Sequence, residues 1–318
     1  MPTAVVTGVL GFIGHHLAER LTSEGYRVSG IDSCRAGPDL DAKVWRLERL
    51  RRQGVEVDLI DLSDAALEAH LPPGAIIFHC AGQGGVRESW DDLAPYLRNN
   101  VTASDRLVAA AIRTGARRLI VSSSSSVYGP HGAPRTPYGI SKLAAEELCL
   151  VRARAAGLEC IALRYFTVYG PGQRADMAFA SFIRSIVAQR PLTVFGDGDQ
   201  RRDFTYVDDV VEANLRAARV AALPENGHVD VGAGHPRTLR DAVAILGREL
   251  DRTPVLEHLP AVPGDPDSTC ADVSALRDFL GWSPAIPLEV GLAAQVRDHL
   301  DRRDIHDGAA TVMRGQNA

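Results

Sequence analysis

The chain has 318 residues, a formal net charge of −5, 45% hydrophobic residues and 24% charged residues. This composition is ordinary for a globular protein, and the length suffices for one large domain or two lobes that share a core. The weak acidic balance predicts no general attraction to nucleic acid or to a membrane surface, and no apolar run is long enough for a membrane span. Five scattered cysteines without a CxxC pair predict reduced thiols in a cytoplasmic protein, with no metal site.

Short β-branched runs alternate with helical patterns through the first half of the chain. The N-terminal run is predicted as a strand that enters a glycine turn, and not as a signal peptide. Regular alternation of strands and helices predicts an α/β fold, a Rossmann-type doubly wound parallel sheet with helices on both faces. Strands are expected over 4–7, 27–31, 55–59, 76–80, 119–122 and 159–164, and helices over 15–24, 96–114 and 138–155.

The alternation breaks up after Arg164, where proline and glycine recur. A helix over 207–222 and a strand over 228–231 that returns to the sheet are still expected. The pattern predicts three parts: a Rossmann domain, a smaller C-terminal lobe that binds substrate, and a disordered tail. Their bounds are 1–166 plus about 205–233 for the first, about 167–204 and 234–303 for the second, and 304–318 for the third.

A glycine-rich turn follows the first expected strand and opens the first helix, with the spacing GxxGxxG. Gly8 permits a tight turn, Gly11 lets the backbone approach a pyrophosphate, and Gly14 lets the helix pack close to the strand. The free N–H groups at the start of the helix then face the phosphates. Asp32 ends the second strand, where a carboxylate accepts hydrogen bonds from a ribose diol and favours NAD over NADP. Together these features predict an NAD site.

Tyr138 and Lys142 are four residues apart near the start of an expected helix, so they share one face of it. A nearby ammonium favours the phenolate and is expected to lower the pKa of Tyr138, which makes the phenol a base at neutral pH. Five serines at 122–126 follow a strand of buried type and precede a Val-Tyr-Gly run. They are therefore expected at the carboxyl end of the sheet, where ligands bind in open α/β folds.

These segments resemble the extended short-chain dehydrogenases/reductases of the NAD-dependent epimerase/dehydratase family, over about residues 3–300. The resemblance implies a catalytic triad of Ser124, Tyr138 and Lys142. It also implies a homodimer that packs the helices at about 96–114 and 138–155 into a four-helix bundle. The NAD contacts that it implies are Gly8, Gly11, Phe12, Ile13, Gly14, Asp32, Asp61, Leu62, Ala81, Asn100, Ser122, Tyr138, Lys142 and Tyr165.

A run of Arg-Asp-Phe-Thr-Tyr-Val beginning at Arg202 resembles the sugar-nucleotide signature of the same family. The arginine at this position binds the diphosphate of a UDP-sugar there, and a planar guanidinium is suited to two phosphate oxygens. The alternative for Arg202 is a surface ion pair with Asp203. The substrate contacts that the resemblance implies are Val86, Arg87, Ser124, Ser125, Ser126, Thr167, Arg174, Arg202 and Asp265.

The residues after Ser124 bear on the reaction. Dehydratases of the family carry Asp-Glu there, and UDP-glucuronate decarboxylases tend to carry glutamate at the position of Ser126. Ser125 and Ser126 are neither acids nor bases near pH 7, which leaves epimerisation. Thr167 stands where glucose-type epimerases usually have asparagine, and it resembles UDP-glucuronate 4-epimerases.

A second segment, Pro-Gly-Asp ending at Asp265 with the residues that follow it, resembles the same subfamily. The hydroxyls of Ser125, Ser126 and Thr167 can donate to a C6 carboxylate without adding a fixed charge. Arg174 is expected on either the diphosphate or the carboxylate, and the sequence leaves this open.

The sequence therefore predicts NAD-dependent epimerisation of UDP-glucuronate to UDP-galacturonate through a 4-keto intermediate. The first alternative is a UDP-glucose or UDP-N-acetylglucosamine 4-epimerase, which would use the same triad. A UDP-glucuronate decarboxylase would lack its usual glutamate. A non-catalytic NAD-binding regulator on the same fold is a further alternative, and the intact triad argues against it.

Overall fold

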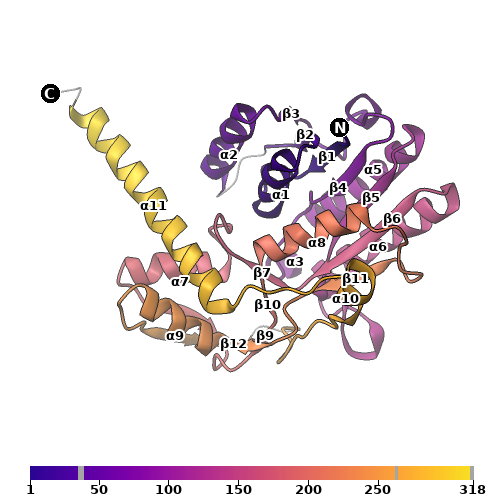
Figure 1. Ribbon diagram of the computed structural model, residues 1–318. Coiled ribbons are helices and arrows are strands. Elements are labelled where there is room, and N and C mark those ends of the chain that lie inside the picture. Colours follow the sequence, from indigo (N-terminus) through magenta and orange to yellow (C-terminus); the bar gives the residue numbers. More distant parts are fainter. Residues whose placement is uncertain (35–38, 262–263, 316–318) are drawn as a thin grey trace.

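The computed structural model describes residues 1–34, 39–261 and 264–315. Seven strands pair in parallel into one sheet, in the order β11-β6-β5-β4-β1-β2-β3 (Figure 1). This confirms the predicted α/β fold, including the strand over 228–231 that returns to the sheet. The strands are β1 (Thr3–Thr7), β2 (Arg27–Asp32), β3 (Glu56–Leu59), β4 (Ile76–His79), β5 (Arg118–Ser124), β6 (Glu159–Tyr165) and β11 (His228–Val231).

Helices cover both faces of the sheet because successive side chains of each strand point to opposite faces. In β1, Ala4 and Val6 belong to one buried cluster and Val5 to the other; in β5, Ile120 belongs to the first and Leu119 to the second. The first cluster includes residues of α1 (Phe12–Ser23), α2 (Leu40–Arg52) and α8 (Val207–Arg219), and the second includes residues of α5 (Ala103–Arg113) and α6 (Pro137–Ala156).

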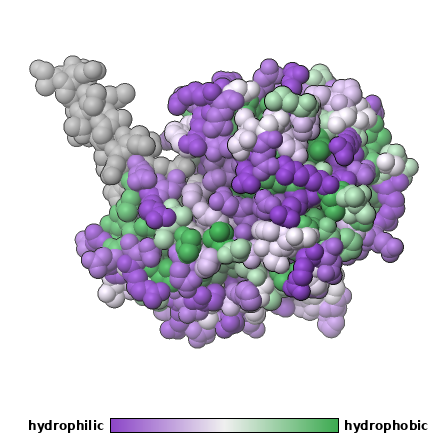
Figure 2. All heavy atoms as spheres, viewed as in Figure 1, coloured by the Kyte–Doolittle hydropathy of each residue, from purple (hydrophilic) through white to green (hydrophobic). Residues whose placement is uncertain are grey.

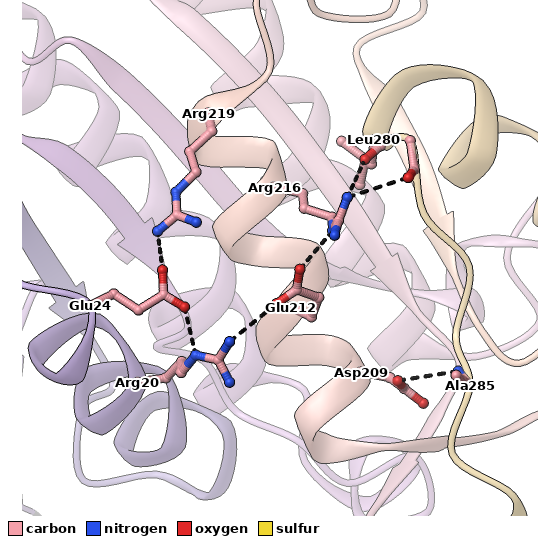
Figure 3. Close-up of polar contacts among 9 residues, drawn as sticks. Arg20, Glu24, Asp209, Glu212, Arg216, Arg219, Leu280 and Ala285 are labelled. Atoms are coloured by element: carbon pink, nitrogen blue, oxygen red, sulfur yellow. Dashed lines mark hydrogen bonds and ion pairs between the residues drawn. The ribbon is translucent and has the colours of Figure 1, made fainter.

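Ion pairs tie two helices of the first face together (Figure 3). Glu24, at the end of α1, pairs with Arg20 at 2.7 Å and with Arg219 of α8. Glu212 of α8 lies 3.6 Å from Arg20 and 2.6 Å from Arg216. Exposed pairs of this kind contribute little individually, but here one network joins both helices.

The remainder of the chain includes three two-stranded sheets and further helices. The paired strands are β7 (Thr167–Tyr169) with β10 (Phe204–Tyr206), β8 (Leu192–Phe195) with β13 (Leu256–Leu259), and β9 (Arg201–Arg202) with β12 (Arg237–Thr238). The helices are α7 (Ala178–Val187), α9 (Leu239–Glu249), α10 (Ser274–Leu280) and α11 (Leu288–Gly315). Figure 1 shows α7, α9, β9 and β12 together on one side of the seven-stranded sheet, at the bottom of the view.

The backbone of α11 stays helical to Gly315, through most of the segment for which the sequence predicted a disordered tail. No proline follows Pro287, so every residue of this segment has a backbone N–H for the helix. Figure 1 shows the end of α11 extending away from the rest of the chain.

Hydrophilic residues cover most of the face shown in Figure 2, with smaller hydrophobic patches between them. Among the residues that the structure describes, no helix combines the length and apolar character that a membrane crossing requires.

Candidate active site

The glycine turn lies between β1 and α1, against the end of β4. Gly8 has φ +66°, and a Cβ added to it would lie 2.6 Å from the backbone nitrogen of Ala81. A Cβ added to Gly14 would lie 2.2 Å from the carbonyl oxygen of Gly8. A Cβ added to Gly11 would meet only the Gly8 carbonyl, at 3.0 Å, and no other atom within 4 Å. Gly8 and Gly14 thus allow the backbone segments to pack closely, and Gly11 leaves space on the outer side of the turn.

The start of α1 is suited to an anion. The helix begins after Gly11 with no side-chain cap, and its first turn carries no acidic residue. The backbone N–H groups of Phe12, Ile13 and Gly14 are therefore available to phosphate oxygens. The turn fits the pyrophosphate of a dinucleotide.

Asp32 ends β2 beside this turn and is 7% exposed. Its carboxylate accepts hydrogen bonds from the backbone N–H groups of Leu10 at 3.1 Å and Cys34 at 2.9 Å, and from the ammonium of Lys43 at 3.1 Å. It braces the glycine turn directly, which the sequence did not predict.

Asp61 and Leu62, the predicted adenine contacts, follow β3. The Asp61 carboxylate accepts hydrogen bonds from the hydroxyl of Ser63 at 2.6 Å and from Arg98 at 3.2 Å. Leu62 is buried. A cavity of about 550 Å³ opens beside them and is lined by Ser63, Asp92, Ala94, Pro95, Arg98, Asn99 and Thr102.

The predicted triad is assembled where β5 ends and α6 begins. Ser124 is the last residue of β5, and its hydroxyl lies close enough to the phenol of Tyr138, in the first turn of α6, to lower the pKa of that phenol. Lys142, one turn further, donates from Nζ to the carbonyl oxygen of Ser122 at 2.6 Å. The hydroxyl of Ser89 accepts the backbone N–H of Tyr138 at 3.1 Å. The structure thus brings the three predicted residues into one site.

The expectation that Lys142 sets the pKa of Tyr138 does not hold. Burial raises the pKa of Tyr138 above its usual value of 10, and the hydrogen bond from Ser124 and the charge of Arg174 offset part of this rise. Burial also lowers the pKa of Lys142. The Lys142 ammonium donates to a backbone carbonyl, and the positive charge that acts on the phenol is that of Arg174.

Asn100 joins the segment after β4 to α6. It is 1% exposed, its Oδ1 accepts the backbone N–H of Gln83 at 2.7 Å, and its Nδ2 donates to Ser141 at 2.9 Å. It lies in a π-helical segment, Leu97–Thr102, between α4 (Ala94–Tyr96) and α5. Such segments are frequent at functional sites, and the sequence predicted only a regular helix here.

Tyr165 ends β6 beside the serine strand. Its hydroxyl is 3.1 Å from the hydroxyl of Ser122 and 2.8 Å from Nδ2 of Asn214 on α8. Ala81 donates its backbone N–H to the hydroxyl of Thr7 at 3.2 Å, so the end of β4 is tied to the end of β1. The predicted contacts after four neighbouring strands therefore gather at one edge of the sheet.

Three hydroxyl residues that were predicted to bind the substrate lie just beyond two neighbouring strands. Ser125 and Ser126 form a short 3-10 turn after β5, and Thr167 begins β7 directly after β6. Ser124 of β5 pairs with Tyr165 of β6. The serine turn and Thr167 thus leave the same edge of the sheet side by side, and all three residues are half-buried.

Arg202 pairs with Asp265 at 2.6 Å and not with Asp203, so the alternative of an Arg202–Asp203 pair is wrong. Asp203 is fully buried and accepts backbone N–H groups at 2.8 Å from Ala233 and Ala271. The sequence did not predict this structural role, because nothing in the pattern around Asp203 indicates that its carboxylate is buried among backbone N–H groups.

Two further arginines lie near the segment that follows β4. The guanidinium of Arg87 is 4.4 Å from the ring centroid of Phe195. Arg174 pairs with Asp176, and its Nη1 lies 2.9 Å from where a Cβ on Gly84 would stand. Val86, between Gly84 and Arg87, is half-buried.

Comparison with known proteins identifies the family. Residues 4–232 match the sequence model of the NAD dependent epimerase/dehydratase family. A UDP-glucuronate 4-epimerase of Thermodesulfobacterium geofontis is 33% identical, with 92% of this chain and 94% of that protein covered. A Bacillus subtilis protein named as an uncharacterised UDP-glucose epimerase is 34% identical, with 92% of this chain and 96% of that protein covered.

Solved structures agree with these relatives. The UDP-glucuronic acid 4-epimerase of Bacillus cereus, in complex with UDP-glucuronic acid and NAD, superposes with a TM-score of 0.88. It is 32% identical, and the match covers 94% of this chain and 99% of that one. The glycine turn, the assembled serine–tyrosine–lysine site and these matches together show that the chain belongs to the NAD dependent epimerase/dehydratase family.

Proposed function

We propose that this protein is an NAD-dependent UDP-glucuronate 4-epimerase, which interconverts UDP-glucuronate and UDP-galacturonate. One observation carries the proposal. The tyrosine–serine pair of Tyr138 and Ser124 is followed by a turn of hydroxyl residues, Ser125 and Ser126, with Thr167 on the neighbouring strand. The names of the relatives from T. geofontis and B. cereus point to the same reaction.

NAD supplies a hydride acceptor and, in its reduced form, a hydride donor. The open side of Gly11 and the uncapped start of α1 support a pyrophosphate site, and Asp32 is proposed to hold the adenosine ribose. The other residues proposed to hold the cofactor are Gly8, Phe12, Ile13, Gly14, Asp61, Leu62, Ala81, Asn100, Ser122, Tyr138, Lys142 and Tyr165.

Tyr138 is proposed to take the proton from O4 of the sugar, directly or through the hydroxyl of Ser124, and to return it after inversion. Lys142 is proposed to orient the cofactor ribose. Arg174 is proposed to act at the sugar, because its charge lowers the pKa of Tyr138 against the effect of burial. The diphosphate is assigned to Arg202, whose ion pair with Asp265 fixes the direction of its guanidinium. Val86 and Arg87 are proposed to border the same site.

Ser125, Ser126 and Thr167 are proposed to bind the C6 carboxylate. Oxidation of glucuronate at C4 gives a β-keto acid, which loses CO₂ when its C5–carboxylate bond aligns with the carbonyl π system. Three donors on one carboxylate can hold this bond out of alignment, and orientation of this kind changes rates strongly. The same donors would explain a preference for UDP-glucuronate over neutral sugars.

A UDP-glucose 4-epimerase is the second candidate. The name of the B. subtilis relative favours it, and hydroxyl side chains can also hydrogen-bond a neutral C6 hydroxyl. Both candidates require the same triad and differ only in the group at C6.

Incubation with UDP-glucuronate, UDP-glucose and UDP-N-acetylglucosamine, followed by chromatography of the products, tests the proposal. We expect UDP-galacturonate as the main product, and a loss of about 10²–10⁴-fold in the Tyr138→Phe variant because the proton acceptor is removed. Faster inversion of UDP-glucose than of UDP-glucuronate would establish the second candidate instead. Thr167→Ala and Ser126→Ala variants should release more UDP-pentose than the wild type.

A homodimer is part of the proposal. Leu97, Ile140 and Val151 lie on the two helical segments that the family pairs, and they are 46%, 56% and 58% exposed. Apolar side chains exposed on packing helices favour burial in a partner interface. We also propose that the chain divides into two lobes at about residues 166, 205 and 233. A cytoplasmic location is proposed as well, because the five cysteines are unpaired.

A further inference from the structure

We infer that the buried ion pair of Glu146 and Arg164 positions the serine turn of the site, Ser124–Ser126, by holding a residue before it and a residue after it. Neither Glu146 nor Arg164 belongs to the site itself, so both would be positioning residues. The inference rests on the proposed function, because it assigns these residues to the geometry of that reaction.

One end of the turn is held by Glu146. This residue lies on α6, two turns after Tyr138, and it is completely buried. Its carboxylate accepts a hydrogen bond from the hydroxyl of Ser123, which directly precedes Ser124. The hydrogen bond from Ser123 to Glu146 thus attaches the end of β5 to α6 one residue before Ser124, and it restricts where Ser124 lies relative to Tyr138 on the same helix.

The other end of the turn is held by Arg164 of β6, which is 7% exposed. Its Nε lies 3.0 Å from Glu146, and its Nη1 donates to the hydroxyl of Tyr128 at 2.9 Å. The guanidinium also lies 4.9 Å from the ring centroid of Tyr128. The Tyr128 hydroxyl in turn donates to Asp230 of β11 at 2.6 Å. Since Tyr128 is the second residue after Ser126, these contacts fix where the turn ends.

Stability alone does not explain this arrangement. Burying two charges is costly, and apolar replacements of a buried ion pair are often as stable or more stable. The Glu146–Arg164 pair adds directional contacts to Ser123 and Tyr128, and these two residues frame the serine turn. A shift of about 1 Å in a catalytic group can lower a rate by roughly 10²-fold, so such contacts matter for the reaction.

The same two strands contain a control pair at their opposite end, whose glutamate is 46% exposed. Arg118 begins β5, Glu159 begins β6, and the two residues pair in register with Nε to Oε2 at 2.9 Å. Arg118 is also buried, at 2% exposed. Because this pair lies at the amino ends of the strands, it is far along β5 from Ser124.

The test compares Glu146→Gln and Tyr128→Phe with Glu159→Gln, in the full-length protein with bound NAD. Each variant is assayed for kcat and KM with the UDP-sugar that the wild type inverts best, and its melting temperature and NAD content are measured. We expect kcat to fall about tenfold or more in the first two variants, with KM changed less than about threefold and NAD retained, because the serine turn is displaced. Glu159→Gln should keep the wild-type kcat.

A second readout separates positioning from simple loss of stability. With UDP-glucuronate, a displaced serine turn should raise the ratio of UDP-pentose to epimer, whereas partial unfolding lowers both products together. If Glu146→Gln fails to fold, Tyr128→Phe decides, since it removes one hydroxyl from a residue that is 43% exposed. A kcat within about twofold of wild type in the folded variants would overturn the inference. A wild type that inverts no UDP-sugar would instead overturn the proposed function.

Discussion

Tyr138 experiences opposing effects on its phenol. Burial raises its pKa, while the hydrogen bond from Ser124 and the charge of Arg174 lower it. A proton acceptor has to be available near neutral pH, so the opposing contributions of Ser124 and Arg174 are what the reaction needs. Arg174 therefore affects the chemistry through its charge as well as through any contact with the substrate.

Removing that charge should shift the pH dependence of the reaction. In Arg174→Ala the pKa of Tyr138 is expected to rise, so the phenolate forms only at higher pH. The acid limb of the kcat/KM profile should therefore move to higher pH. Arg174→Lys, which retains a positive charge, should keep the limb close to that of wild type. A limb that stays in place in Arg174→Ala, measured by initial rates across pH, would contradict this role.

Individual residues differ in how far the sequence could predict them. Gly8, Gly14 and Tyr138 stand in motifs whose spacing has a direct physical meaning, and the structure places them as the motifs imply. Asp203 and Glu146 could not be predicted, because their partners come from distant segments. Only the folded chain brings Ala233 to Asp203 or Arg164 to Glu146.

At the scale of elements, the seven strands of the large sheet were well predicted, because most of their β-branched runs are buried and lie between clear turns. The short strands of the two-stranded sheets were not predicted. The π-helical segment around Asn100 was not predicted, since one extra residue per turn leaves no mark on hydrophobic periodicity. The helical backbone of α11 beyond Asp304 was also not predicted, because the sequence from about Asp304 shows no apolar periodicity.

One element contact should depend on pH. Asp209 of α8 accepts the backbone N–H groups of Ala285 and Ile286, both at 3.4 Å, as Figure 3 shows for Ala285. Burial raises the pKa of Asp209 to about 6, above its ordinary value of 3.8. The folded state then binds more protons than the unfolded state between these two pH values. The contribution of this carboxyl to stability is therefore greatest at low pH and falls as pH rises toward 6.

Asp209→Asn removes this titration and retains an acceptor for one N–H group. Between about pH 4 and pH 6, the free energy of unfolding of the wild type should fall by on the order of 1–2 kcal/mol relative to this variant. This is less than the pKa shift alone would give, because solvent screens part of the interaction. Urea unfolding at several pH values measures the difference. Asp278→Asn, which removes an exposed carboxylate on α10, is the control. Parallel stability curves for wild type and Asp209→Asn would contradict the prediction.

In the whole molecule, the order of strands decides where the site lies. β1 and β4 are neighbours in the sheet although β2 and β3 separate them in the chain, so the strand order reverses between them. Ligands bind outside the carboxyl ends of strands at such a point. The glycine turn after β1, Ala81 after β4 and Ser124 at the end of β5 meet there because parallel strands end at one edge. The sequence predicted the sheet, and hence this convergence, but not the buried contacts that fix the serine turn.

Deuterium at C4 of UDP-glucuronate reports most directly on whether one site removes a hydride and returns it to the opposite face. The purified protein, without added NAD, is incubated with the labelled substrate, and the product is analysed by mass spectrometry and NMR. We predict UDP-galacturonate that retains deuterium at C4, formed about 10²–10⁴-fold more slowly by Tyr138→Phe. Inverted product in which deuterium has been replaced by hydrogen from water would contradict hydride transfer within this site.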